Sequence, residues 1–168
     1  RSDRPRVGGV ALSAVRAVRA LSALLFLGAC FRPAPAPYTP KDPALAALPL
    51  FFYPTAVSSA PAKAFIFFVG NDIGFWGAHQ DLAKRLAGAG YDVVGFDTKP
   101  YFDRLPESDS LRAIHYRDSV GVMIARARHE LHADSLPVVV AGHSLGAELA
   151  SWIAVQAPPS NLQGVLLI

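Results

Sequence analysis

The sequence predicts an α/β fold with a mostly parallel sheet and helices on both faces of that sheet. Three observations carry this prediction. Apolar runs of strand length alternate along the chain with segments of helical periodicity. The run over residues 64–69 is apolar throughout, which is typical of a strand buried on both faces. Residues 137–149 pass from a β-branched run through two glycines into helix-forming residues, which is the order of a strand, a sharp turn and a helix.

The first half of the predicted domain contains two strands and one helix. Residues 49–53 fit a short strand, and residues 64–69 form the next one. A loop over residues 70–76 then precedes a helix that ends at Gly90. Apolar residues at spacings of three and four mark one face of this helix; they are Leu82, Leu86 and Ala89.

The second half continues the alternation. Residues 91–96 form a third strand that ends at Asp97, and a loop follows it. A long helix fits residues 108–132, because apolar residues recur there every three or four positions. These residues are Tyr116, Val120, Met123, Ala127 and Leu131. After a turn at residues 142–146 come a helix and a last strand over residues 164–168. The apolar side of that helix consists of Leu149, Trp152 and Ile153.

The turn at residues 142–146 reads Gly-His-Ser-Leu-Gly and fits a nucleophile elbow, a strained strand-to-helix turn that exposes a serine hydroxyl. Ser144 is therefore the candidate nucleophile. Gly142 and Gly146 lack Cβ atoms, which lets the strand and the helix approach each other closely. The N–H of Leu145, at the start of the helix, is free to stabilise an oxyanion. The alternative interpretation is an ordinary glycine-flanked turn.

The loop over residues 70–76 is expected at the same edge of the sheet as Ser144, because the carboxyl ends of parallel strands meet there. The backbone N–H of Asn71 is the candidate second oxyanion donor, with an ordinary turn as the alternative. Asp97 closes its strand, which is more typical of a cap than of a residue that orients a base. The side chains assigned to substrate binding are Asp72, Trp76 and Tyr101. For Tyr101 the alternative is packing within its loop.

The histidines of the sequence do not include a convincing general base. His143 is a neighbour of the candidate serine in one tight turn, where successive side chains point in different directions. The others lie in predicted helices, and none follows a strand; they are His79, His115, His129 and His132. No spacing of Cys and His is typical of a metal site. We therefore expect neither a metal nor a cofactor.

Residues 1–29 predict an export signal, because Arg16 and Arg19 precede an apolar run that is too short to span a bilayer. The run ends in Leu-Gly-Ala-Cys at Cys30, which resembles the bacterial lipobox, whose cysteine becomes the lipidated first residue of the mature protein. The prolines of residues 30–48 predict a semi-extended tether. The expected location is the periplasm or the cell surface, with a lipid anchor in the membrane. A soluble secreted protein and an uncleaved anchor are the alternatives.

The positive net charge of +3 belongs mainly to the N-terminal segment. Five of the sixteen Lys and Arg residues and one of the thirteen Asp and Glu residues lie in residues 1–29, which leaves about −1 for the remainder. Such a balance does not indicate a nucleic-acid partner.

Residues 49–168 resemble the N-terminal portion of an α/β-hydrolase in their order of elements and in their elbow. Within that superfamily, the loop Gly-Asn-Asp-Ile-Gly-Phe-Trp over residues 70–76 and the pair Tyr101-Phe102 resemble the bacterial virulence protein VirJ/AcvB-type domain, whose loop is shorter. The resemblance implies a periplasmic serine hydrolase that acts on an ester or lipid. Some members are similar to hydrolases of lysyl-phosphatidylglycerol. Others are associated with virulence or secretion, which implies the second hypothesis: a non-catalytic binding protein with a periplasmic protein partner.

In the family pattern, the acid and the histidine of the catalytic triad follow later strands. The sequence starts without Met and stops inside a predicted strand, at Ile168. We therefore expect both ends to be incomplete, the fold to be truncated before its last strands, and the two missing triad members to lie beyond residue 168. Loss of triad members is costly, so this fragment is expected to be almost inactive.

Overall fold

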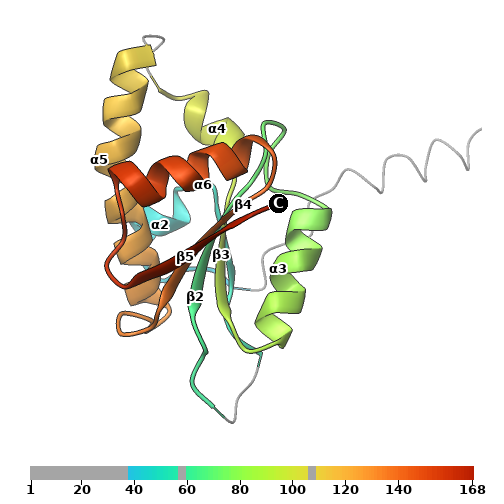
Figure 1. The fold of residues 1–168 in the computed structure, drawn as a ribbon. Coiled ribbons are helices and arrows are strands. Elements are labelled where there is room, and N and C mark those ends of the chain that lie inside the picture. The colour runs from blue at the N-terminus through green and yellow to red at the C-terminus, as the bar shows by residue number, and fades with distance from the viewer. Residues whose placement is uncertain (1–37, 57–59, 106–108) are drawn as a thin grey trace, which may run out of the picture. The chain divides into compact units, whose positions relative to one another are not determined.

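The structure is a computed structural model that describes residues 38–56, 60–105 and 109–168 (Figure 1). The described residues all belong to one compact unit. The predicted signal peptide and Cys30 lie outside the described residues. Within the described ranges, no helix combines the length and the apolar character that a membrane span requires.

The domain is built on a five-stranded sheet in the order β1-β3-β2-β4-β5. The strands are β1 (Leu50–Tyr53), β2 (Phe65–Val69), β3 (Asp92–Phe96), β4 (Val138–Gly142) and β5 (Leu162–Leu167). β1 runs antiparallel to β3, while the other three pairings are parallel. The prediction of a mostly parallel sheet is therefore confirmed.

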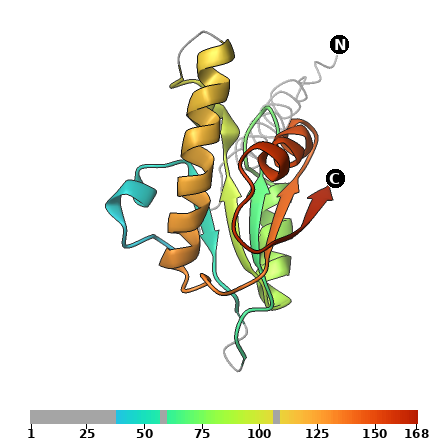
Figure 2. The ribbon, with the colours of Figure 1, turned by 60° about the vertical axis from the view of Figure 1, so that its left-hand side comes forward.

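Helices cover both faces of the sheet (Figures 1 and 2). The helix α3 (Ala78–Gly88) lies on one face, and α5 (Asp109–Glu130) and α6 (Leu145–Gln156) lie on the other. A hydrophobic core lies on each face of the sheet, and alternate side chains of β2 point into one or the other. Phe65 and Phe67 lie in the core under α5 and α6, and Phe68 lies in the core under α3. The unbroken apolar run of this strand is thus explained by burial on both faces.

The apolar pattern of the helices is confirmed for α5 and α6 and only in part for α3. Leu82 and Leu86 pack against the core, but Ala89 is exposed at the end of the helix. The most deeply buried residues of α3 are His79, Gln80, Ala83 and Ala87. The predicted apolar face did not include His79 or Gln80. Small alanines bring α3 close to the sheet, and His79 and Gln80 satisfy their polar atoms on nearby groups.

The predicted tether over residues 30–48 is wrong for its described part, which begins at Tyr38. Tyr38 forms an antiparallel bridge with Phe52 of β1. A short helix, α2 (Pro43–Ala46), follows, and its Leu45 is 1% exposed within the core. Proline is well tolerated in the first turn of a helix, so Pro43 starts a helix here instead of extending a linker.

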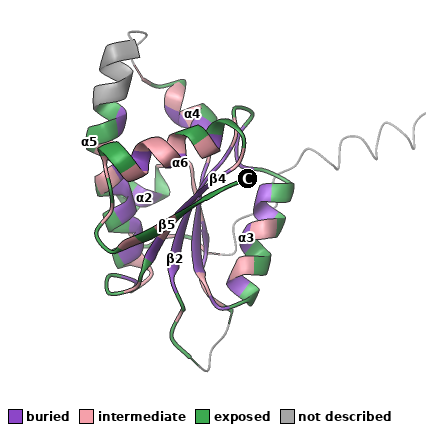
Figure 3. Cartoon of the chain, in the orientation of Figure 1, coloured by how far each residue is buried: buried purple, intermediate pink, exposed green. Residues whose placement is uncertain are grey.

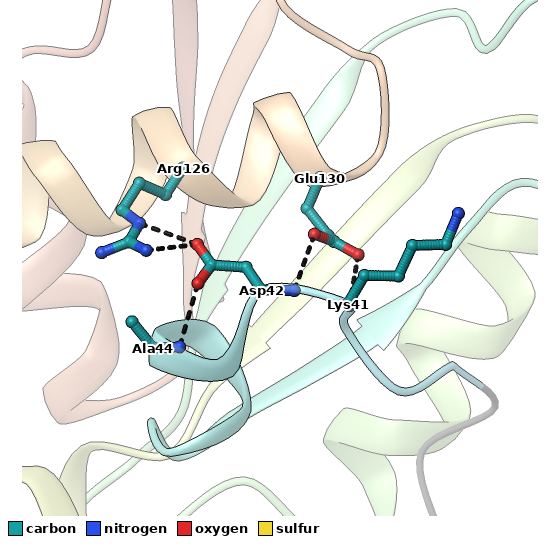
Figure 4. A network of polar contacts seen from close by, with 5 residues as sticks. All are labelled: Lys41, Asp42, Ala44, Arg126 and Glu130. Atoms are coloured by element: carbon teal, nitrogen blue, oxygen red, sulfur yellow. Dashed lines mark hydrogen bonds and ion pairs between the residues drawn. The ribbon is translucent and has the colours of Figure 1, made fainter.

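Polar contacts attach this N-terminal segment to α5 (Figure 4). Asp42 caps α2 through the N–H of Ala44 and forms an ion pair with Arg126. Glu130 accepts hydrogen bonds from the backbone N–H of Lys41 and of Asp42, and from the hydroxyl of Tyr38. The domain therefore includes residues ahead of the predicted boundary at residue 49.

A short helix, α4 (Thr98–Phe102), stands where a loop was expected after β3. Asp97 is its N-cap and accepts a hydrogen bond from the N–H of Lys99, so the interpretation of Asp97 as a cap is confirmed. At the edge of the sheet opposite to β1, β5 is exposed over most of its length (Figure 3).

Candidate active site

The turn between β4 and α6 has the strained geometry of a nucleophile elbow. Ser144 lies between the two elements with φ 55° and ψ −123°, a combination that residues with a Cβ atom rarely adopt. Serine often caps a helix with its hydroxyl, but in the described part of the chain Ser144 makes no such bond to α6. The hydroxyl is exposed at the carboxyl edge of the sheet. Strain of this kind is concentrated at functional sites.

The two glycines of the motif are required by close backbone contacts. A Cβ atom on Gly142 would lie 2.0 Å from the carbonyl oxygen of Gly146. A Cβ atom on Gly146 would lie 2.3 Å from the carbonyl oxygen of Gly70 and 2.4 Å from that of Val69. The elbow therefore packs directly against the end of β2, and no side chain fits between them.

The loop after β2 is tightly folded and is held by the end of β3. The N–H of Gly70 donates to the carbonyl of Phe96 at 2.9 Å, and the hydroxyl of Thr98 donates to the carbonyl of Asn71 at 2.9 Å. Within the loop, Asn71 pairs with Gly74, whose N–H donates to the Asn71 carbonyl at 3.1 Å. Asn71 is thus a fixed backbone element close to the elbow, and its role as an oxyanion donor stays a prediction.

The carboxylate of Asp97 lies against this loop and accepts a hydrogen bond from its backbone. Gly74 has φ 114°, and a Cβ atom there would lie 2.8 Å from a carboxylate oxygen of Asp97. Burial raises the pKa of Asp97, while hydrogen bonds from the backbone of Lys99 and Phe75 oppose the change. Asp97 therefore fixes the loop through Phe75 and caps α4 at the same time.

Two histidines meet beside the elbow. His79, in the first turn of α3, is 6% exposed, and its Nε2 lies 3.2 Å from Nδ1 of His143. Its other ring nitrogen, Nδ1, lies 3.1 Å from the carbonyl oxygen of Trp76. Burial lowers the pKa of His79, and the nearby His143 contributes in the same direction, whereas the Trp76 carbonyl and the charge of Asp97 oppose it. The pair therefore favours a neutral His79.

A small hollow opens at this pair. It has a volume of about 200 Å³, and its walls are mostly apolar. It is lined by Phe68, Ala78, His79, Leu82, His143 and Ile168. Ile168 accepts a hydrogen bond from the N–H of Ser144 at 3.0 Å, so the hollow lies directly beside the candidate nucleophile.

The residues assigned to substrate binding do not all lie at the elbow. Asp72 and Trp76 are exposed on the loop after β2, next to the elbow. Tyr101 is 9% exposed, and its ring packs against Phe96 and Tyr116 in the core on the face of the sheet that α5 and α6 cover. Tyr101 also lines a separate hollow along α5, and no residue of the elbow lines that hollow. Its position fits the packing role that was the alternative for it.

Two further histidines, His129 and His132, lie away from Ser144. His129 and His132 are exposed near the carboxyl end of α5, where the chain turns into β4. Since β4 runs from that turn to the elbow, these two side chains belong to the opposite edge of the sheet. In the described ranges, no three side chains of His, Cys, Asp or Glu are grouped as a metal site would require.

Sequence reasoning missed the contribution of His79. A histidine inside an apparent amphipathic helix is normally assigned to solvent, and its contact with His143 joins positions 64 residues apart. The available signal was local: two histidines, one in the elbow and one just after the loop expected beside it.

The fold is the α/β-hydrolase fold: a mostly parallel sheet flanked by helices, with a serine at a strained turn after the interior strand β4. No protein-family model and no curated protein sequence matches the chain.

Solved structures similar to the chain include two lipases and an esterase. Monoglyceride lipase of Saccharomyces cerevisiae, solved with a substrate analogue, has a TM-score of 0.54 and 16% identity over 80% of this chain and 47% of its own. A lipase in its open form has a TM-score of 0.52 and 20% identity over 70% and 38%. A thermostable carboxyl esterase of Bacillus coagulans, solved with glycerol, has a TM-score of 0.51 and 14% identity over the same shares. The chain spans less than half the length of these proteins.

Proposed function

We propose that the protein is a serine hydrolase that cleaves an ester, with Ser144 as its nucleophile. The observation that carries this proposal is the backbone of Ser144, with φ 55° and ψ −123° at the start of α6. A conformation this costly, roughly 1–3 kcal/mol, is retained where it serves a function. The fold shared with lipases and an esterase supports the same class of reaction.

In the proposed reaction, the Ser144 oxygen attacks the ester carbonyl carbon and its proton passes to a histidine base. The backbone N–H groups of Leu145 and Asn71 stabilise the oxyanion that forms. The intermediate then collapses, the ester C–O bond breaks, and the histidine returns the proton to the departing alcohol. Water attacks the acyl-enzyme by the same route and releases the acid. The base and its acid partner are proposed to follow residue 168.

We further propose an aminoacyl-phospholipid as the substrate class. The VirJ-like loop over residues 70–76 supports this assignment, and so does the lipid anchor proposed at Cys30, which would keep the site near the membrane surface. Asp72 is exposed on that loop, and an exposed carboxylate there suits the ammonium group of an aminoacyl ester.

The test is covalent labelling of the complete protein with a fluorophosphonate, which reacts with activated serines. The wild type is expected to be labelled and Ser144→Ala is not. Ser151→Ala is the matched control, because Ser151 is on the same helix and its hydroxyl donates to the Ala147 carbonyl. This variant should be labelled like the wild type.

Hydrolysis is then compared on vesicles of lysyl-phosphatidylglycerol and of phosphatidylglycerol. Preferential release of lysine supports the aminoacyl-phospholipid assignment, and equal or no turnover removes it. A folded wild type without labelling would contradict the hydrolase proposal and favour the binding-protein hypothesis.

A further inference from the structure

We propose that His79 is a positioning residue that holds the loop over residues 70–76 against the elbow through a hydrogen bond to His143. The inference rests on the proposed function for its catalytic readout, since this loop and the elbow carry the two proposed oxyanion donors. Its structural readout is independent of any activity.

On the loop side, His79 is attached to the last residue of the loop. Both its Nδ1 and its backbone N lie 3.1 Å from the carbonyl oxygen of Trp76. The imidazole ring also packs between aromatic rings, with centroids 5.5 Å from Phe75 and 5.7 Å from Phe68. On this side the ring is therefore fixed by one hydrogen bond and two aromatic contacts, and the backbone N–H of His79 adds a second hydrogen bond to the same carbonyl.

On the elbow side, His79 reaches the residue next to the candidate nucleophile. Its Nε2 lies 3.2 Å from Nδ1 of His143, and the two rings meet edge to face at 5.1 Å. His143 immediately precedes Ser144, so a restraint on its side chain acts on the strained turn itself. The elbow and the loop also touch through backbone, since Gly146 packs on Gly70.

The hydrogen-bond pattern determines which nitrogen of His143 carries the proton. A carbonyl oxygen only accepts hydrogen bonds, so Nδ1 of His79 must carry a proton in order to bond to Trp76. In a neutral His79 the other nitrogen, Nε2, is then an acceptor. His143 must therefore donate from its own Nδ1, which leaves its Nε2 unprotonated. The pair thus holds His143 in one tautomer.

Nuclear magnetic resonance of the complete protein with ¹⁵N-labelled histidine tests this pattern directly. In the wild type, the neutral form of His143 is expected to carry its proton on Nδ1. His79→Phe keeps an aromatic ring between Phe68 and Phe75 and removes both hydrogen bonds, so His143 should lose this preference. His115→Phe, at an exposed position of α5, is the matched control and should change nothing. A wild-type His143 protonated at Nε2 would overturn the proposal.

The catalytic readout separates positioning from structural damage. In His79→Phe, the rate constant for fluorophosphonate labelling is expected to fall by about tenfold to 100-fold, because small displacements of oxyanion donors have effects of this order. The final extent of labelling should stay complete. A loss of extent at an unchanged rate constant would show a merely structural role and would contradict the proposal.

A double-mutant cycle with His143→Phe tests whether the two histidines act together. If they do, the second substitution has little further effect on the labelling rate once His79 is replaced. Independent effects that add would contradict the proposal. If the wild type is not labelled at all, the proposed function fails, and the tautomer of His143 together with hydrogen exchange of residues 70–76 still decides the structural part. Unchanged exchange in His79→Phe would overturn it.

Discussion

Ser144 holds a backbone conformation that favours glycine over every other residue. In the described chain the Ser144 hydroxyl does not cap α6, so the serine adds no capping hydrogen bond that would offset the strain. Serine at this position therefore opposes stability locally, and the proposed nucleophilic role explains why a side chain is present.

This strain predicts that Ser144→Gly stabilises the protein and abolishes its activity. Relief of a positive φ is worth roughly 1–3 kcal/mol, and the extra freedom of glycine in the unfolded chain offsets roughly 0.5–1 kcal/mol of that. The free energy of unfolding should rise by about 1 kcal/mol, measured by urea denaturation. Ser144→Ala, which keeps the Cβ atom, is the control and should leave stability almost unchanged. Destabilisation by glycine would show that the turn is not strained.

The lowered pKa of His79 predicts that the free energy of unfolding depends on pH. Its pKa is lowered by burial from 6.5, with His143 lowering it further and the Trp76 carbonyl and Asp97 opposing. Below pH 6.5 the folded protein then binds fewer protons than the unfolded chain. The contribution of His79 to the free energy of unfolding is therefore fully present above pH 6.5, and it is lost as the pH falls through the lower pKa of the folded state.

The measurement compares urea denaturation of the wild type and His79→Phe between pH 8 and about pH 5, the range in which a histidine titrates. The wild type should lose more stability than the variant over the acid half of this range. Parallel pH profiles for the two proteins would contradict the assignment of a depressed pKa to His79.

At the edge of the sheet opposite to Ser144, the buried side chain of Arg128 connects two turns. Arg128 of α5 is 3% exposed and donates to the carbonyl and the hydroxyl of Ser160, in the turn between α6 and β5. It also donates to three carbonyls in the turn between α5 and β4, those of Ala133, Asp134 and Leu136. One planar guanidinium thus connects two turns that are distant in the sequence.

Replacement of Arg128 by methionine is expected to destabilise the domain by about 3 kcal/mol, because several buried or partly buried carbonyls lose the same donor together. Arg128→Lys should recover little of this, since an ammonium cannot reproduce the planar fork. Arg117→Met is the matched control on the same helix. Its exposed ion pair with Asp118 should contribute less than about 1 kcal/mol. Equal effects of the two methionine variants in thermal denaturation would refute this role of Arg128.

At the scale of the whole molecule, the features that sequence predicts are those encoded within a few residues. The apolar run of β2, the glycines around Ser144 and the periodicity of α5 each indicate their structure locally. The docking of Tyr38 and Asp42 on α5 was missed, because prolines nearby suggested a tether, while the partners Glu130 and Arg126 are 92 and 84 positions away.

The candidate site divides in the same way. The elbow is local in sequence and was predicted, and the cap role of Asp97 followed from its place at a strand end. The pairing of His79 with His143 and the burial of Tyr101 depend on how helices pack on the sheet, which residue spacing alone does not specify. Sequence reasoning therefore left His79 without a role, and it assigned Tyr101 to substrate binding with packing as the alternative.

The central claim, that Ser144 is an activated nucleophile, is tested most directly by locating the fluorophosphonate adduct. The complete protein is labelled, digested and sequenced by mass spectrometry. The account predicts a single adduct, on the Ser144 hydroxyl, with a rate far above that of a free serine. An adduct on another residue, or none on a protein shown to be folded, would contradict it.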